Sequence, residues 1–275
     1  MTSRTKSSIG RTLVYLGALI TFGSLFFMLL FIFIKGVPHI SLDLFAWDYT
    51  TENVSLMPAL ITTLFTIFGS LLIAGPIGIF TAIYLVEYAD RSKPIVKLIA
   101  MATDTLAAVP SIVYGLFGFL FFVTFLEFSF SLIAGILTMT IMVLPLIIRS
   151  TEEALLSVGT PLRQASFALG AGKLRTIFSV VLPVAMPGIL SGVILAIGRI
   201  MGESAALIYT LGSSTNLPAS IFSSGRTLAV HMYVLSNEGF HVNEAYATAV
   251  VLVFVVLILN ALSTMISRRF TKGGK

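Results

Sequence analysis

The stretch PALITTLFTIFGSLLIAGPIGIFTAIYLV, residues 58–86, contains no Asp, Glu, Lys or Arg. An α-helix rises about 1.5 Å per residue, so a helix of this length exceeds the roughly 30 Å hydrocarbon core of a bilayer. Backbone polar groups in hydrocarbon must be satisfied within the chain, which leaves helices or closed barrels. A long unbroken apolar run favours the helix. Residues 58–86 therefore predict a transmembrane helix that is tilted or continues into the interface.

The rest of the chain has the same character. Of its 275 residues, 57% are hydrophobic and 11% are charged, and the mean hydropathy is +1.01, so lipid is expected to be the main solvent. Further stretches long enough to cross a membrane lie near residues 13–34, 105–126, 129–148, 184–212 and 245–267. The sequence predicts an all-α polytopic membrane protein with six transmembrane helices, the third and fourth of which form a tight hairpin across Glu127.

The distribution of charge predicts the topology. We expect an N-terminal tail at 1–12, a transmembrane domain at 13–267 with long loops at 149–183 and 213–244, and a basic tail at 268–275. Fourteen of the seventeen Lys and Arg residues lie in the two tails and in the loops after the second and fourth spans. Positive residues concentrate in cytoplasmic segments, so both termini and the first long loop are predicted to be cytoplasmic.

The N-terminus could also begin a signal peptide, because Arg4, Lys6 and Arg11 precede an apolar run. That run is too long for a signal peptide, and no A-x-A cleavage site follows it. We expect an uncleaved first helix and a multi-pass protein of the cell membrane, that is, the plasma or inner membrane.

Composition also argues against other classes of protein. The net charge of +5 does not form a basic patch interleaved with aromatic residues, so no nucleic-acid partner is expected. The chain has no cysteine, which excludes disulfides and thiolate metal sites. Its histidines, His39, His231 and His241, are scattered without ligand spacing, so no metal site is expected.

The first long loop contains LRQASFALGAGKLRTIFSVVLP, residues 162–183, and this segment resembles the E-A-A loop of ABC-importer permeases. In that family the pattern is E-A-A, three residues, Gly, nine residues, Ile, one residue, Leu-Pro. The spacing is kept in full here, with Gln in place of Glu, Ser in place of the second Ala and Val in place of Ile. The matching residues are Gln164, Ala165, Ser166, Gly170, Val180, Leu182 and Pro183, with Ala171 directly after the glycine.

The same segment predicts a short helix that ends at Gly170, because glycine adopts the left-handed backbone conformation at little energetic cost. A second helix is predicted to enter the membrane at Pro183. The resemblance implies that the short helix docks in a groove of an ATPase subunit. Gly170-Ala171-Gly172-Lys173 looks like part of a phosphate-binding P-loop, but Phe167 and Leu174 stand where that motif needs Gly and Ser or Thr. This chain is therefore expected to bind no ATP.

The fifth predicted span carries two charges, Arg199 and Glu203, four residues apart and expected on one helix face. Each costs on the order of 3 kcal/mol at the bilayer centre without a partner or water. They could simply neutralise each other as a structural pair. Alternatively, the guanidinium of Arg199 could donate hydrogen bonds to an oxyanion that passes through the membrane. Glu203 would then hold that guanidinium in place or accept a hydrogen bond from a protonated phosphate oxygen. Ser204 is placed in the same pathway.

Pro110 lies inside the third predicted span, where proline removes one backbone hydrogen bond and loosens the preceding turn. With Ser111 and Tyr114 it could line the same pathway. A simple packing kink is the other interpretation.

The segments VPSIVYGLFG (109–118), LPLIIRSTEEAL (144–155) and GRIMGESAAL (198–207) together resemble the A-type permease subunit of phosphate-specific ABC importers, and SSGRTLAVHMY (223–233) agrees with this. The resemblance runs from about residue 55 to the C-terminus. It implies a type I ABC-importer permease fold, a C-type permease partner, two ATPase subunits that bind ATP and Mg, and an extracytoplasmic phosphate-binding protein. No cofactor is expected on this chain, which is expected to be a transporter subunit and not an enzyme.

Three other functions stay open on the sequence. An ABC permease for sulfate, molybdate or phosphonate would have a similar sequence, because no residue of the apolar spans indicates the size of the transported anion. A stand-alone channel or secondary transporter could use Arg199 and Glu203 for ion coupling, but it would not need the docking loop. An intramembrane protease would need a nucleophile and a base at membrane depth, yet all three histidines lie in predicted loops and no G-x-S-x-G motif occurs.

Overall fold

The computed structural model describes the backbone of residues 3–90 and 92–272, with side chains over 11–90 and 92–265, and all regular structure in that part is helical. The prediction of an all-α protein is confirmed. The ends of the two predicted tails, residues 1–2 and 273–275, lie outside the described residues. In chain order the α-helices are α1 (Ser3–Gly36), α2 (Met57–Ile83), α3 (Pro94–Ala107), α4 (Ser111–Gly118), α5 (Leu132–Ser157), α6 (Thr160–Ala168), α7 (Lys173–Thr176), α8 (Leu182–Gly202), α9 (Ala205–Thr210), α10 (Leu228–Glu238) and α11 (Val242–Lys272).

Shorter turns extend several of these helices. Two 3-10 turns, Val37–His39 and Leu42–Phe45, follow α1. Three π-helical turns, Tyr84–Tyr88, Phe119–Phe125 and Ile177–Val181, prolong α2 and α4 and join α7 to α8. The first long loop is shorter than the predicted 149–183 and consists mainly of α6, because α5 continues to Ser157 and the next span begins at Lys173.

Five stretches of the described chain are long and apolar enough to cross a membrane, and a sixth exists if α3 and α4 count as one span. The five are Arg11–His39, Met57–Tyr88, Leu132–Ser157, Lys173–Gly202 and Val242–Met265. The sixth is bent by 102° between α3 and α4, so the prediction of a continuous third helix over 105–126 is wrong. The physical reason is Pro110, which disfavours helical backbone at the residue before it.

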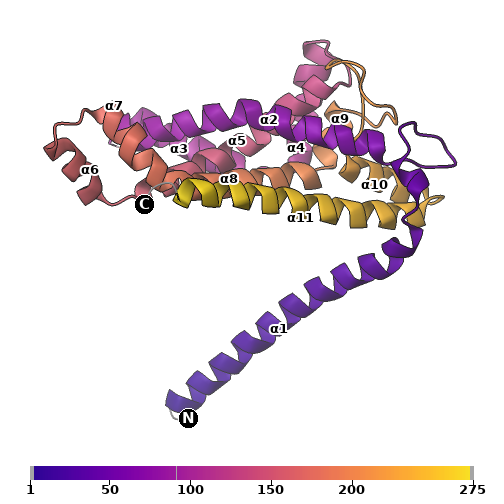
Figure 1. Ribbon diagram of the computed structural model, residues 1–275, viewed down its shortest axis with the longest axis horizontal. Helices are drawn as coiled ribbons and strands as arrows, with labels where there is room; N and C mark the ends of the chain where they lie inside the picture. The colour runs from indigo at the N-terminus through magenta and orange to yellow at the C-terminus, as the bar shows by residue number, and fades with distance from the viewer. Residues whose placement is uncertain (1–2, 91, 273–275) are drawn as a thin grey trace.

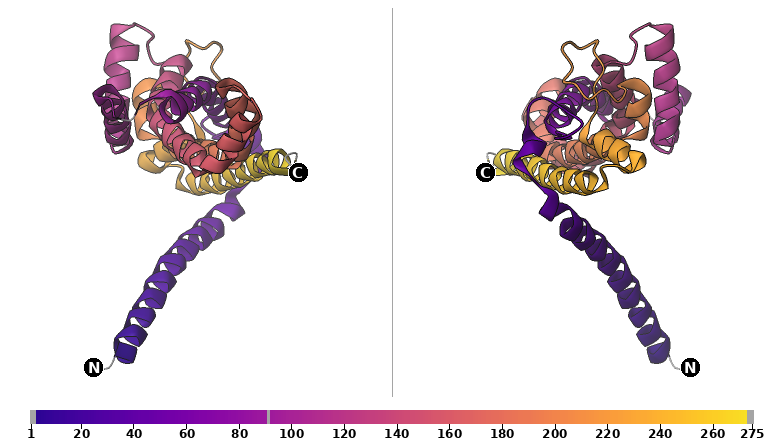
Figure 2. Two further views of the ribbon diagram at one scale, coloured as in Figure 1. Left: turned by 90° about the vertical axis from the view of Figure 1, so that its left-hand side faces the viewer. Right: turned by 90° about the vertical axis from the view of Figure 1, so that its right-hand side faces the viewer.

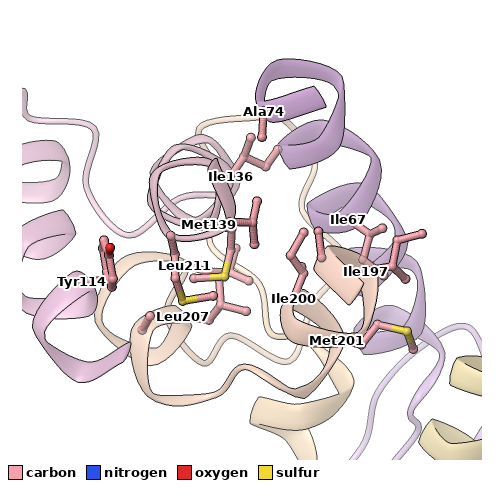
Figure 3. Close-up of a cluster of buried hydrophobic side chains, with 14 of the residues drawn as sticks. Ile67, Ala74, Tyr114, Ile136, Met139, Ile197, Ile200, Met201, Leu207 and Leu211 are labelled. Atoms are coloured by element: carbon pink, nitrogen blue, oxygen red, sulfur yellow. The ribbon is translucent and has the colours of Figure 1, made fainter. Parts of the chain in front are cut away.

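The helices α2, α5, α8 and α11 run along the longest axis of the molecule (Figure 1). Buried side chains from α2, α5, α8 and α9 fill the space between them, among them Ile67, Met139, Ile200 and Leu207, each no more than 1% exposed (Figure 3). Hydrocarbon tails are as apolar as these side chains, so close packing and not water exclusion holds such helices together inside a bilayer.

Glycines allow α8 to approach α5 closely at one end only. A Cβ atom on Gly188 would lie 2.6 Å from the Cβ atom of Ala154, and one on Gly192 would lie 1.7 Å from the Ser150 hydroxyl oxygen. At Gly198 and Gly202, on the same helix, an added Cβ atom would meet nothing within 4 Å. The glycines of α8 therefore pack against α5 in its first half, whereas the positions of Gly198 and Gly202 in its second half face open space beside a buried face that includes Ile200.

The helix α1 stands apart from the bundle over most of its length (Figures 1 and 2). It touches α11 near its C-terminal end, where the ring centroids of Phe31 and Tyr246 lie 5.8 Å apart and Gly36 lies against Tyr246. Elsewhere its apolar side chains are exposed, including Phe22 at 72% and Phe26 at 68%. Lipid or another helix must cover this surface in a membrane.

At the end opposite α6, contacts between Tyr49, Arg226 and His231 connect α10 to the loop before α2. The guanidinium carbon of Arg226 lies 4.8 Å from the centroid of the Tyr49 ring, and the His231 ring meets Tyr49 edge-on at 6.3 Å. His231 is fully buried. Burial, helped by the nearby positive charge of Arg226, lowers the pKa of His231 to about 3.

Replacement of Gly188 by Ala should lower the free energy of unfolding by about 1–3 kcal/mol, because the new methyl group collides with Ala154. Gly198→Ala, on the same helix but in open space, should be neutral or stabilising by up to about 1 kcal/mol. The measurement is denaturant unfolding in bicelles. Equal losses in the two variants would contradict the asymmetric packing of α8.

The buried His231 should make the fold sensitive to mild acid. The unfolded histidine takes up a proton near its ordinary pKa of 6.5 whereas the folded one stays neutral down to about 3, so stability is present above pH 6.5 and is lost as the pH falls. This residue contributes a slope of about 1.4 kcal/mol per pH unit. Unfolding measured between about pH 7 and pH 5 should show a shallower loss in His231→Gln, while His39→Gln, which changes an exposed histidine, should match the unmodified chain.

Candidate functional site

The fifth predicted span is broken beside its two charges. The helix α8 ends at Gly202, Glu203 is extended with ψ 126°, and α9 begins at Ala205. The Glu203 Oε1 atom accepts a hydrogen bond from the backbone N–H of Ala206 at 3.1 Å, which satisfies one of the unpaired donors at the start of α9. The prediction of one helix over 184–212 with Arg199 and Glu203 on one face is wrong. Glycine is a poor helix former, and here the carboxylate stabilises a new helix start instead.

A second break lies before α4. Pro110 is extended, with φ −60° and ψ 143°, and α4 starts at the next residue, Ser111. Pro110 is thus not inside a helix, as the sequence suggested, but at the 102° bend. Proline fits a helix start because it lacks the N–H group that would be unpaired there. Across the bend, the Tyr114 hydroxyl donates to the carbonyl oxygen of Leu106 at 2.7 Å and so ties α4 to the end of α3.

The two helices that follow these breaks lie side by side. A Cβ atom on Gly115 of α4 would lie 2.8 Å from the Cα atom of Ala206 in α9, and one on Gly118 would lie 2.6 Å from the Thr210 methyl group. Both pairs advance together along the chain, so α4 and α9 run in the same direction, and α4 begins nearly one helical turn before the level at which α9 begins. Two helix starts, each inside an apolar span, therefore stand next to each other.

Arg199 lies one turn before the α8–α9 break and is partly exposed. Among the residues whose side chains the structure describes, no carboxylate lies within salt-bridge distance of Arg199. The interpretation in which Glu203 merely neutralises it is therefore wrong within this chain, and the guanidinium donors remain available.

The predicted pathway residues do not share one closed cavity. Ser204 and Gly202 line a cavity of about 480 Å³ between the α8–α9 break, α10 and α11, with Tyr233 and Ser236 on its opposite wall. Tyr114 lines a separate apolar cavity of about 260 Å³ between α3, α4 and α5. Ser111 is partly buried and Pro110 is exposed. The structure thus brings Glu203 and Ser204 together at the α8–α9 break, and it places Pro110, Ser111 and Tyr114 at the separate α3–α4 bend.

The loop that resembles an E-A-A motif has the predicted local structure. The helix α6 ends at Ala168, Gly170 adopts the left-handed conformation with φ +81°, and the chain re-enters a helix at Lys173 that continues through Pro183. A groove of about 420 Å³ runs beside this turn. Its lining includes Ala165, Ser166, Gly170, Ala171 and Val180, all of which the sequence singled out. Gln164 is exposed on the helix beside the groove.

Two ion pairs near the α6 end were not predicted. Arg163 of α6 pairs with Glu87 at 2.8 Å, with side chains only 17% and 10% exposed. Arg149 of α5 pairs with Asp104 of α3 at 3.0 Å. Each pair joins residues far apart in the chain, so no local spacing could have revealed it.

A bundle of apolar helices with two broken spans, an arginine that meets no carboxylate among the described side chains and a short helix that ends before a left-handed glycine is the architecture expected of a membrane permease. The chain matches the family model described as "Binding-protein-dependent transport system inner membrane component" over residues 74–273, more than half of its length. The chain belongs to that family.

Two relatives resemble this chain over nearly their whole length. It is 34% identical to the probable ABC transporter permease protein YqgI of Bacillus subtilis, with 88% of this chain and 89% of the relative covered. It is 33% identical to the phosphate transport system permease protein PstA of Haemophilus influenzae, with 94% and 92% covered. A crystal structure of a bacterial alginate ABC transporter matches with a TM-score of 0.70 at 17% identity, covering 98% of this chain and 99% of the other, which supports the ABC-importer permease fold.

Removal of the Tyr114 hydroxyl should loosen the α3–α4 bend. Tyr114→Phe removes one of two donors to the Leu106 carbonyl, which keeps the Val109 N–H, and should lower the free energy of unfolding by about 0.5–1.5 kcal/mol. Tyr209→Phe removes an equal group from a half-exposed tyrosine of α9 and serves as the control. If bicelle unfolding gave the same value for both variants, the hydrogen bond across the bend would have no net effect on stability.

Proposed function

We propose that this chain is a transmembrane permease subunit of an ABC importer that moves inorganic phosphate into the cytoplasm. The observation that carries the proposal is Arg199, which meets no carboxylate among the described side chains and lies one turn before the start of α9, in a chain whose full-length relatives include a phosphate transport permease. ATP hydrolysis takes place on partner chains. This chain itself binds neither ATP nor Mg.

The proposed complex contains this chain, a C-type permease subunit, two ATPase subunits and an extracytoplasmic phosphate-binding protein. The ATPase docks at α6 and its groove, with both termini on the same cytoplasmic side. The concentration of Lys and Arg at that end supports this orientation. The open half of α8 at Gly198 and Gly202 supports a pathway that the partner permease completes.

Phosphate recognition in this proposal combines a charge with helix geometry. The guanidinium of Arg199 offers a planar set of N–H donors that suits a tetrahedral oxyanion. The start of α4, at Ser111, adds unpaired backbone N–H groups and the positive end of a helix dipole. Broken helices whose N-termini face an anionic group near the midplane recur in membrane transporters. The low-dielectric surroundings strengthen each of these interactions.

Glu203 combines a contact that the sequence did not suggest with the phosphate contact that it did. Its Oε1 atom accepts a hydrogen bond from the Ala206 N–H and so stabilises the start of α9 after the break. A carboxylate has further acceptor sites, which could take a hydrogen bond from a protonated phosphate oxygen. Fully deprotonated sulfate has no such proton to donate, so Glu203 would favour phosphate over sulfate.

The test is ATP-driven uptake of labelled phosphate by the whole complex in proteoliposomes, with sulfate as competitor. Arg199→Gln should lower uptake by at least about tenfold, because it removes a charged donor that contacts the anion. Arg199→Lys should recover part of the activity, since it keeps the charge and loses the planar set of donors. Lys35→Gln, which removes an exposed positive charge at the end of α1, should leave uptake unchanged.

Two results would count against the proposal. Unchanged uptake in Arg199→Gln would remove the arginine from the pathway. An assembled complex that hydrolyses ATP and moves sulfate but not phosphate would assign the importer to another oxyanion.

A further inference from the structure

The helix α6 makes few side-chain contacts with the rest of the bundle. None of its residues, 160–168, is fully buried, and Phe167 is 46% exposed. Toward α7 it is held by a hydrogen bond of 2.9 Å between the hydroxyl groups of Ser166 and Thr176. Toward α2 and α5 it is held by the side chain of Arg163.

The Arg163 guanidinium joins the ends of two spans. Its Nε and Nη2 atoms donate to Glu87 Oε1 at 3.1 Å and 2.8 Å, in the π-helical turn that ends α2. Nη2 also donates to the Leu155 carbonyl oxygen at 2.8 Å, and Nη1 donates to the carbonyl oxygen of Val158. Those two carbonyls belong to the last turn of α5 and the residue just beyond it, where helices leave acceptors unpaired.

This contact is suited to transmit movement. Arginine is a planar donor set with fixed geometry, so several simultaneous hydrogen bonds fix its position and direction. The pair with Glu87 is mostly withdrawn from solvent, at 17% and 10% exposure, and is therefore weakly screened by salt. Removal of either partner would leave a largely buried charge without compensation.

We propose that Arg163 is the positioning residue that transmits the movement of α6 to α2 and α5. The proposal rests on the assignment of α6 as the ATPase-docking helix. Gln164 and Ala165, directly after Arg163, are exposed toward a partner, so Arg163 lies between the docking surface and the bundle. The route onward runs through α5, which packs along α2 and α8 and contacts α9 at the candidate site.

The experiment compares phosphate uptake with ATP hydrolysis in the complete complex, reconstituted in proteoliposomes. Arg163→Gln should still bind the ATPase subunits and hydrolyse ATP, but the phosphate moved per ATP should fall by at least about fivefold. A merely structural role would lower the amount of assembled complex, and with it uptake and hydrolysis in proportion, without changing that ratio. A proportional loss would therefore overturn the proposal.

Two further variants distinguish a loss of transmission from misfolding of the complex. Arg163→Lys keeps a positive charge beside Glu87 but cannot reach all three acceptors, so the ratio should fall by less than in Arg163→Gln. Glu87→Gln should lower the ratio as well, and the double variant with Arg163→Gln should be no worse than the more affected single one, because both remove one interaction. Glu153→Gln, an exposed carboxylate at the same end of α5, is the matched control and should leave the ratio unchanged. Additive losses in the double variant would contradict a shared role.

Failure of the cargo assignment can be told apart from failure of this inference. If the unmodified complex moves sulfate and not phosphate, the proposed cargo is wrong, yet the same ratio can be measured with labelled sulfate. An unchanged ratio in Arg163→Gln with whichever anion the complex moves would overturn the role of Arg163 alone.

Discussion

The need to satisfy every backbone polar group without water governs this structure. Unbroken helices meet the requirement by themselves, but each helix end leaves unpaired N–H or C=O groups. At three such ends a polar side chain adds a hydrogen bond to the backbone: Glu203 at the start of α9, Tyr114 at the end of α3 and Arg163 at the end of α5. Breaks in apolar spans can therefore persist only where particular polar residues stand, and these residues define the candidate site.

The two functional regions lie at different depths of one bundle. The helix α6, which we propose as the docking helix, and its groove occupy one end, and the α8–α9 break lies along the spans (Figure 1). The helix α5 connects them, because it is the most deeply buried span and packs on α2, α8 and α9. A densely packed helix moves as a unit, so a displacement at its end next to α6 reaches the level of α9 without unfolding.

The bundle presents surfaces that a partner must complete. The helix α1 exposes apolar side chains along most of its length, α8 is open at Gly198 and Gly202, and Pro110 is exposed at the α3–α4 bend. An arginine without a carboxylate partner at such an opening is costly in hydrocarbon unless water, an anion or another subunit reaches it. These features agree with the proposed heterodimer, in which the pathway lies between two permeases.

The sequence by itself determined the helical class, the apolar stretches that can span a membrane and the glycine-ended turn at Gly170, because hydrophobic runs and backbone freedom are local properties. It also singled out Arg199, since a charge within an apolar run stands out. Only the tertiary structure decided that α8 stops at Gly202, that Glu203 serves α9 and not Arg199, and that Arg163 meets Glu87. Spacing in a sequence predicts proximity only while one helix continues, and contacts between distant segments depend on how the helices pack.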